Sequence, residues 1–463
     1  MPRASARCLY ARAYEALFYP AWQRVVRGRP IGTHLQVLEA TQWLGAEERD
    51  RLQLESLRAL LDHAARNITY WRELFAHLRF DPRDIRCKGD LLILPILTRE
   101  IISERYDDLV DPAHRGRNIQ KGTSGTSGIP LKFEYCNESE AWRQATRLRG
   151  YGWAGYRMGL PTVHYWGAGS GPPAGFAGGK VHLDRALKRE AYVDAIKQDE
   201  ASMRSAAAVF SRMKPHCVVA YTQALAAFAR WTTERGVRDW PDARVICGAE
   251  ALLPHDRQAI ALAFGPQIFE TYGSRETMLV AAECEIHDGM HLSDENLLVE
   301  IARDGRPVSD GEPGDVLITD LHNYGMPLIR YANGDLATMA SDGGCACGRG
   351  LRKLARVEGR TSDTLRDANG DPVPGMVIIS LLAHEAGLLR AFQGVQKASG
   401  EVELRIVRGR DWDEARFSRT ARRIEAYFKG LPLRVSYCDQ IPALKSGKRH
   451  PIVIENDAES RES

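Results

Sequence analysis

CVVAYTQALAAFARWTTERG, residues 217–236, indicates the fold class. A short apolar run is followed directly by a segment with the apolar spacing of a helix, and that segment ends at Gly236. The same alternation continues over residues 151–280. Strands are expected at PTVHYW (161–166), ARVICGAE (243–250) and QIFETYG (267–273), and helices at SMRSAAAVFSRM (202–213) and HDRQAIALAF (255–264). Strands that alternate with helices predict a layered α/β fold with parallel strands.

Three parts are predicted along the chain. Residues 1–115 are expected to be a helical lead-in to a large domain, with LQLESLRALLDHAARN (52–67) the clearest helix. Residues 116–359 would form the core of that domain. Residues 360–463 restart the pattern as a strand, a helix and a strand, which predicts a small mobile α+β domain.

Composition limits the classes of function. The 463 residues are too many for one ordinary core, and 44% hydrophobic with 27% charged residues is typical of a soluble globular protein. A net charge of +3 gives no reason to expect a nucleic-acid partner. No apolar run is long enough to span a membrane. Nine cysteines without a secretory signal suggest reduced thiols and a cytoplasmic location.

The segment ARCLYARAYEALFYPAWQRVVRGR (6–29) is similar to a basic amphipathic helix broken at Pro20. Such a segment commonly packs its apolar side on its own domain. Weak contact with an anionic membrane surface is the alternative.

A glycine-rich stretch, GTSGTSGIPLKF (122–133), suggests a phosphate site. Its glycines permit close approach of a ligand to backbone N–H groups, and its hydroxyls add donors without bulk. It is not a Walker A loop, because Ile129 and Pro130 stand where Lys and Ser or Thr are required. A flexible surface turn is the structural alternative.

Five further motifs follow this loop in order: GAE (248–250), ETYGSRE (270–276), PLIRYANGDLA (327–337), EGR (358–360) and KSGKRHPIVI (from Lys445). Together they resemble the adenylate-forming superfamily. The closer resemblance is to the phenylacetate-CoA ligase branch, which includes capsule-biosynthesis ligase-like proteins and deazaflavin-coenzyme-adenylating synthetases. NITYWRELFA (67–76) with LPILTR (94–99), CACGRG (from Cys345) and FQGVQ (392–396) carry it.

The resemblance implies ATP-dependent activation of a carboxylic acid as acyl-AMP, followed by transfer to coenzyme A, by an AMP-forming acid–thiol ligase. Lys448, Glu276 and Arg275 would be catalytic, with Glu276 helping to hold Mg²⁺. Asp335 would bind the ribose, and Arg360 the ribose or phosphate. The other residues implied in nucleotide binding are Thr123, Ser124, Gly125, Thr126, Ser127, Gly128, Gly248, Ala249, Glu250, Thr271, Tyr272, Gly273 and Ser274.

Two positions depart from the family pattern. Arg275 replaces the usual threonine, and Ser362 stands at the usual hinge position. Both leave the second half-reaction open. The alternatives are an adenylyltransferase that passes AMP or the acyl group to a non-CoA acceptor in a polysaccharide or natural-product pathway, and a catalytically silent nucleotide-binding or scaffold protein. The oligomeric state is expected to be monomer or homodimer.

The acyl pocket is expected between the glycine loop and GAE. Tyr135, His164, Trp166 and Gly167 are the candidate lining residues, with Gly169 and Phe176 as further ones. Their aromatic character favours an aryl or arylacetic acid. The stretch HYWGAGSGPPAGFAGG (164–179) is expected to be a mobile loop.

A second site is suggested by Cys345 and Cys347, with Cys284 and His291 upstream. Four such ligands suit a structural Zn²⁺ that clips a loop. His287 is the alternative to His291, and unrelated free thiols are the alternative to a metal site.

Overall fold

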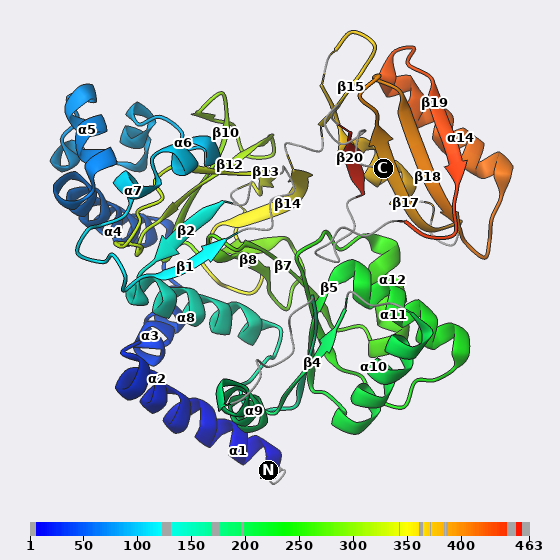
Figure 1. Cartoon of the computed structure of the whole chain (residues 1–463), viewed down its shortest axis with the longest axis horizontal. Coiled ribbons are helices and arrows are strands. Elements are labelled where there is room, and N and C mark those ends of the chain that lie inside the picture. Colours follow the sequence, from blue (N-terminus) through cyan, green and yellow to red (C-terminus); the bar gives the residue numbers. More distant parts are fainter. Residues whose placement is uncertain are drawn as a thin grey trace.

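The computed structural model describes residues 6–122, 131–167, 176–195, 199–341, 343–360, 364–370, 372–383, 385, 388–441 and 451–455. A large N-terminal part contains a 12-stranded mixed sheet, and a smaller C-terminal part contains a four-stranded sheet (Figure 1). The predicted α/β class is confirmed. No helix in these ranges has the length and apolar character needed to cross a lipid bilayer.

Half of the large sheet is parallel, as the strand–helix alternation predicts. Its order is β7-β6-β5-β3-β4. The strands are β3 (Thr162–Trp166), β4 (Glu190–Asp194), β5 (Cys217–Tyr221), β6 (Arg244–Gly248) and β7 (Ile268–Ser274). Helices α10 (Glu200–Met213), α11 (Thr222–Arg235) and α12 (Pro254–Phe264) share a buried core with these strands. On the other face α8 (Asn137–Trp153) packs against β5 and β6.

The other half of the large sheet is antiparallel and continues in the order β8-β9-β14-β13-β12-β10-β11. Its strands are β8 (Met278–Glu283), β9 (Met290–Leu292), β10 (Leu297–Arg303), β11 (Arg306–Pro307), β12 (Pro313–Asp320), β13 (Tyr331–Met339) and β14 (Lys353–Arg360). A short hairpin of β1 (Ile119–Gly122) and β2 (Lys132–Tyr135) forms a separate sheet.

The lead-in is helical, as expected. Its helices are α3 (Ile31–Thr41), α4 (Ala46–Asn67), α5 (Thr69–Leu78), α6 (Arg99–Glu104) and α7 (Tyr106–Leu109), with 3₁₀ turns at Pro82–Asp84 and Lys88–Ile93. Leu57, Leu61 and Trp71 share a buried core with Leu328 and Tyr331 of the antiparallel half. Burial of these apolar side chains from water fixes the lead-in onto the sheet.

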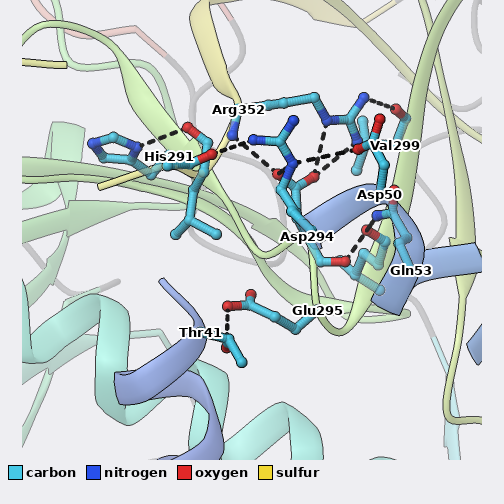
Figure 2. Close-up of polar contacts among 12 residues, drawn as sticks. Thr41, Asp50, Gln53, His291, Asp294, Glu295, Val299 and Arg352 are labelled. Carbon is cyan, nitrogen blue, oxygen red and sulfur yellow. Dashed lines mark hydrogen bonds and ion pairs between the residues drawn. The ribbon is translucent and has the colours of Figure 1, made fainter. Parts of the chain in front are cut away.

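Polar contacts tie the lead-in to the turn before β10 (Figure 2). Thr41 donates to Glu295 (Oγ1···Oε1 2.9 Å), and Gln53 donates to the carbonyl of Asp294 (Nε2···O 2.8 Å). The buried Asp294 carboxylate pairs with Arg352 (Oδ1···Nη2 2.8 Å). Burial alone would raise the pKa of Asp294, but the Arg352 guanidinium outweighs it and lowers that pKa.

The small part follows β14. It contains β15 (Thr364–Arg366), β16 (Pro372–Pro374), α13 (Gly375–Ala383), β17 (Leu389–Gln396), β18 (Val402–Arg408), α14 (Glu414–Glu425), a 3₁₀ turn (Ala426–Phe428), β19 (Leu433–Tyr437) and β20 (Ile452–Ile454). The predicted strand–helix–strand unit is β18–α14–β19, and its two strands are parallel neighbours. Leu253 of the large part packs against the core of this part.

Two local predictions are wrong. The N-terminal helix is not broken at Pro20: α1 (Ala6–Ala13) and α2 (Tyr19–Arg27) run on through a π turn at Tyr14–Phe18. The wider turn accommodates the proline, which lacks the N–H that a regular turn uses. The expected loop at 164–179 is also too long, because α9 (Phe176–Lys188) already begins at Phe176.

Candidate active site

The glycine-rich stretch connects the two strands of the β1–β2 hairpin, in which Gly122 faces Lys132. Residues 123–130 themselves, with the predicted phosphate-binding Thr123, Ser124, Gly125, Thr126, Ser127 and Gly128, lie outside the described residues. Arg275 donates a hydrogen bond to the Gly122 carbonyl (Nη1···O 2.8 Å), at the point where β1 ends and the glycine-rich stretch begins. The turn of Arg275 is itself held by buried Arg143 of α8, which donates to the Arg275 carbonyl (Nη2···O 2.7 Å). The ETYGSRE turn and the glycine-rich stretch are therefore neighbours.

Glu276 is buried beside this turn, with 3% of its surface exposed. Its Oε1 atom pairs with Arg99 (Nη2, 3.0 Å) and accepts a hydrogen bond from Tyr331 (OH, 3.0 Å). Burial raises the pKa of the Tyr331 phenol, and the Glu276 carboxylate raises it further. The phenol therefore remains a donor to Glu276 at neutral pH.

A second polar cluster joins β7 to β13. The Tyr272 hydroxyl donates to Asp335 (OH···Oδ2 2.8 Å), and Asn333 donates to the same carboxylate oxygen (Nδ2···Oδ2 2.9 Å) and to the Tyr272 oxygen (2.7 Å). The backbone of Arg360, at the end of β14, lies opposite Asp335 in the sheet register. The sequence predictions for Tyr272, Asp335 and Arg360 thus fall in one place.

The GAE turn follows β6 directly. Ala249 has φ of 69°, a left-handed conformation that is uncommon for a residue other than glycine. Thr222 donates to the Glu250 carbonyl (2.9 Å), and the Glu250 carboxylate accepts from the backbone of Gln223 (3.0 Å). These bonds anchor the turn to the start of α11. Backbone strain that the surroundings maintain is typical of functional sites.

Gly248 allows close packing between the ends of β6 and β7, and Gly273 allows close packing between β7 and β8. A Cβ on Gly248 would lie 2.9 Å from the hydroxyl of Thr271, which donates to the Cys247 carbonyl (2.8 Å). Ser274 contacts the hydroxyl of Thr277 (3.0 Å), and Gly273 lies against the backbone of Met278.

The predicted acyl-pocket residues lie in three different environments. Trp166 and Gly167 lie against Tyr221: the two rings are 4.3 Å apart between centroids, and a Cβ on Gly167 would meet the tyrosine ring. Tyr135 lies under the Arg143 guanidinium, 4.2 Å from its ring centroid. His164 is different, because it stacks on Tyr192 (4.4 Å) and faces the Glu190 carboxylate (Nε2···Oε1 3.5 Å).

The Glu190 carboxylate that faces His164 also interacts electrostatically with Arg147 of α8, and, although burial raises the pKa of Glu190, both groups lower it. Tyr156 donates to the Glu190 carboxylate (OH···Oε1 3.0 Å). Arg147 donates to Gln144 (Nε···Oε1 3.2 Å) and lies 5.5 Å from the ring centroid of Tyr151. Among the described residues no carboxylate lies within ion-pair distance of Arg147.

The predicted metal ligands Cys284, His291, Cys345 and Cys347 come together, with their ligand atoms all within 4.8 Å of one another. The sulfurs of Cys284 and Cys345 are 3.8 Å apart, and the sulfur of Cys347 is 3.3 Å from Nε2 of His291. Tetrahedral Zn²⁺ with Zn–S bonds of 2.3 Å requires sulfurs about 3.8 Å apart, so this donor set fits zinc.

The alternative ligand His287 points elsewhere. Its Nδ1 atom contacts Glu283 (3.1 Å), and its ring lies on Phe269. The other ring nitrogen of His291, Nδ1, faces the Leu351 carbonyl at 3.4 Å, which leaves Nε2 directed at the cysteines.

Several predicted residues cannot be located, because they lie outside the described part of the chain: Gly169, Ser362 and Lys448. Others were missed by the sequence interpretation. Arg99 belongs to the LPILTR motif and Asn333 to RYANGD, so the motifs contained the signal while the individual residues were not singled out. Tyr331 lies in the same RYANGD motif and was likewise not singled out, whereas Arg143 carries no local sequence signal, since its role depends on contacts across the fold.

Comparisons with known proteins identify relatives of this arrangement. No protein-family model matches the chain. The sequence is 26% identical to phenylacetate-coenzyme A ligase of Escherichia coli strain K12 over 350 residues, 71% of this chain and 75% of that protein. It is also 26% identical over 353 residues to phenylacetate-coenzyme A ligase of Thermus thermophilus, which covers 73% of this chain and 76% of that protein.

Solved structures share the fold. A 2-hydroxyisobutyryl-CoA ligase in the postadenylation state superposes with a TM-score of 0.74 and 18% identity, over 91% of this chain and 92% of that one. The same ligase in the thioesterification state gives 0.58 over the same share of this chain.

The fold is that of the adenylate-forming CoA ligases. Within that class the chain is a sequence relative of the phenylacetate-coenzyme A ligases, and the resemblance expected from its motifs is confirmed.

Proposed function

We propose that this protein is an AMP-forming acid–thiol ligase that activates an aryl or arylacetic acid. The observation that supports this most directly is that the ETYGSRE motif contacts two other predicted sites. Its Arg275 contacts Gly122, where the glycine-rich stretch begins, and its Tyr272 contacts Asp335.

The reaction has two steps. A carboxylate oxygen of the acid attacks the α-phosphorus of ATP, and pyrophosphate leaves with the electron pair of the broken P–O bond. The thiol of coenzyme A, after losing its proton, then attacks the acyl carbon, and AMP leaves. Because the substrates supply the nucleophile in each step, the protein's contribution is positioning and stabilisation of charge.

Individual roles follow from chemistry and position. The Asp335 carboxylate, already held by Tyr272 and Asn333, would accept hydrogen bonds from the ribose hydroxyls. The Tyr272 ring and the GAE turn would flank the adenine, and Arg360 would reach the ribose or phosphate. The glycine-rich stretch would bind the β- and γ-phosphates, and Lys448 would stabilise the charge at the α-phosphate.

Glu276 would help to hold Mg²⁺, which neutralises phosphate charge when bound. Its Oε1 atom is engaged by Arg99 and Tyr331. These contacts fix the carboxylate in a buried place beside the ETYGSRE turn.

The acid is expected to carry a ring, because Trp166 and Tyr221 offer aromatic surfaces with ring centroids 4.3 Å apart.

Zinc is proposed as a structural ion at Cys284, His291, Cys345 and Cys347, where four protein ligands leave no open position. It would hold the CACGRG turn against the start of β9.

The function is tested by ATP–pyrophosphate exchange across a panel of benzoic and arylacetic acids, followed by mass spectrometry of products formed with coenzyme A. Acid-dependent exchange and an acyl-CoA product are expected. Exchange without an acyl-CoA product would favour transfer to another acceptor. Folded protein that shows no exchange with any acid would favour a catalytically silent nucleotide-binding or scaffold protein.

A further inference from the structure

The N-terminal helix presents an apolar surface to solvent. We define the N-terminal apolar face as Leu17, Phe18, Ala21, Trp22, Val25 and Val26. The large side chains are well exposed: 67% for Leu17, 67% for Phe18, 53% for Trp22, 82% for Val25 and 55% for Val26. The sequence interpretation expected such side chains to pack on the protein's own domain, and this is wrong for the described residues.

These residues form a continuous stripe. Leu17, Ala21 and Val25 make one i,i+4 row, and Phe18, Trp22 and Val26 make the adjacent row. The opposite side of the helix is the anchored one: Tyr19 is buried, and Gly32 of α3 lies against Pro20. The helix lies at the edge of the large part (Figure 1); it is held by one side, and the side chains of the apolar face on the other side are exposed.

Charge around the face has one sign. Arg24 and Arg27 are exposed on α2, which contains no acidic residue, and Arg12 is exposed in the last turn of α1. The acidic side chain of the helix, Glu15, pairs with Arg157 (3.7 Å). An exposed apolar stripe flanked by arginines is the pattern of a helix that lies in the interface of an anionic bilayer.

We propose that the N-terminal apolar face docks on an anionic lipid bilayer, with the helix in the plane of the surface. A second copy of the chain fits less well, because a two-fold contact through this face would bring the same arginines toward one another. No described segment of the chain covers the face. This inference does not rest on the proposed function, since no residue of the candidate active site takes part.

Vesicle co-sedimentation tests the proposed docking on an anionic lipid bilayer. The full chain is mixed with vesicles of phosphatidylcholine alone or of equal phosphatidylcholine and phosphatidylglycerol. The wild type is expected to sediment with the anionic vesicles, less so in high salt, and much less with neutral ones. The double variant Phe18→Ser/Trp22→Ser should reduce the partition coefficient at least about tenfold, because two apolar anchors are removed. Arg24→Ala/Arg27→Ala should weaken binding to the anionic vesicles.

The matched control is Leu262→Ser, a similarly exposed leucine on α12 (61%) outside the face, which should bind like the wild type. Circular dichroism checks that each variant is folded. Equal sedimentation of wild type and Phe18→Ser/Trp22→Ser, or no binding to anionic vesicles, would overturn the proposal. A dimer that light scattering detects in the wild type and that Trp22→Ser abolishes would overturn it in favour of a subunit interface.

Discussion

The Arg99 guanidinium and the Glu276 carboxylate form an ion pair 3.0 Å apart, across 177 positions of the chain. Glu276 is the carboxylate that we propose to hold Mg²⁺, and Arg99 begins α6 in the helical lead-in. The lead-in thus contacts the candidate active site directly. Burial lowers the pKa of Arg99, but the Tyr331 and Glu276 groups outweigh it and raise that pKa, so the guanidinium stays charged.

Removal of one partner should therefore destabilise the fold. Arg99→Leu leaves the Glu276 carboxylate buried with one hydrogen bond. We expect a loss of about 2 kcal/mol in the free energy of unfolding, below the range for fully buried pairs because Arg99 is partly exposed. Urea denaturation of Arg99→Leu, Glu276→Gln and the double variant measures it. Strictly additive losses would show that the two side chains are not coupled.

The Tyr272 hydroxyl is expected to matter for ATP rather than for folding. Tyr272→Phe removes one side-chain donor to Asp335 and leaves the Asn333 donor in place. The KM for ATP in pyrophosphate exchange should rise about tenfold with little change in kcat, because the variant loses one charge-assisted hydrogen bond to Asp335. Tyr437→Phe, a tyrosine of β19 that donates to Glu414, is the matched control and should behave as wild type. An unchanged KM in Tyr272→Phe would remove Asp335 from the ribose role.

Zinc should be lost when one of its proposed ligands is changed. Cys345→Ser is expected to bring zinc per chain close to zero and to lower Tm, because a structural ion contributes folding free energy. Cys438→Ser, outside the cluster, should retain both zinc and Tm. Elemental analysis and thermal unfolding measure these effects. Wild-type protein purified without chelators that contains no zinc would contradict the assignment.

Glu270 should give stability a pH dependence. Burial, together with the nearby Glu283 carboxylate, raises the pKa of Glu270 to about 7 from its ordinary value of 4.5. The folded protein therefore holds a proton that the unfolded chain has released between these values, so this group makes stability fall as pH rises from about 4.5 to 7.

Glu270→Gln removes this contribution and keeps an acceptor for the Leu252 N–H (3.0 Å). The variant should gain on the wild type as pH rises, by at most about 3 kcal/mol above pH 7. Unfolding curves at pH 5 and pH 8 test it. A difference between the two proteins that is the same at both pH values would contradict the assignment.

The sequence predicts most strands and helices in the parallel half of the large sheet, but fewer of the side-chain contacts between elements. Strand β5 and helix α11 were correctly predicted because apolar spacing is a local property. Strand β4, with Glu190 and Asp194, is a short polar edge strand and lacks that pattern. The partners of Glu276 could not be predicted, because Arg99 and Tyr331 reach it only through tertiary packing.

The metal cluster and the N-terminal helix illustrate the same limit. Spacing left His287 and His291 as alternatives, and the pairing of β9 with β8 and β14 directs His291 toward the cysteines. The pattern at residues 6–29 indicated an amphipathic helix, but which side the domain covers depends on Tyr19 and Pro20 packing inward.

Movement between the two parts should separate the half-reactions. In the described residues the parts meet where Leu253 packs on the small core and where the His255 and Phe392 rings lie 6.3 Å apart. Ser362, which lies outside the described residues, follows the end of the main sheet at Arg360. A proline there fixes φ and should prevent the rotation that the second step requires. We expect Ser362→Pro to form acyl-AMP within about twofold of the wild-type rate and to lose thioester formation roughly 100-fold.

Ser362→Ala, which leaves φ unrestricted, should retain both steps in pyrophosphate exchange and acyl-CoA assays. Equal losses in both half-reactions for Ser362→Pro would place the pivot elsewhere in the chain.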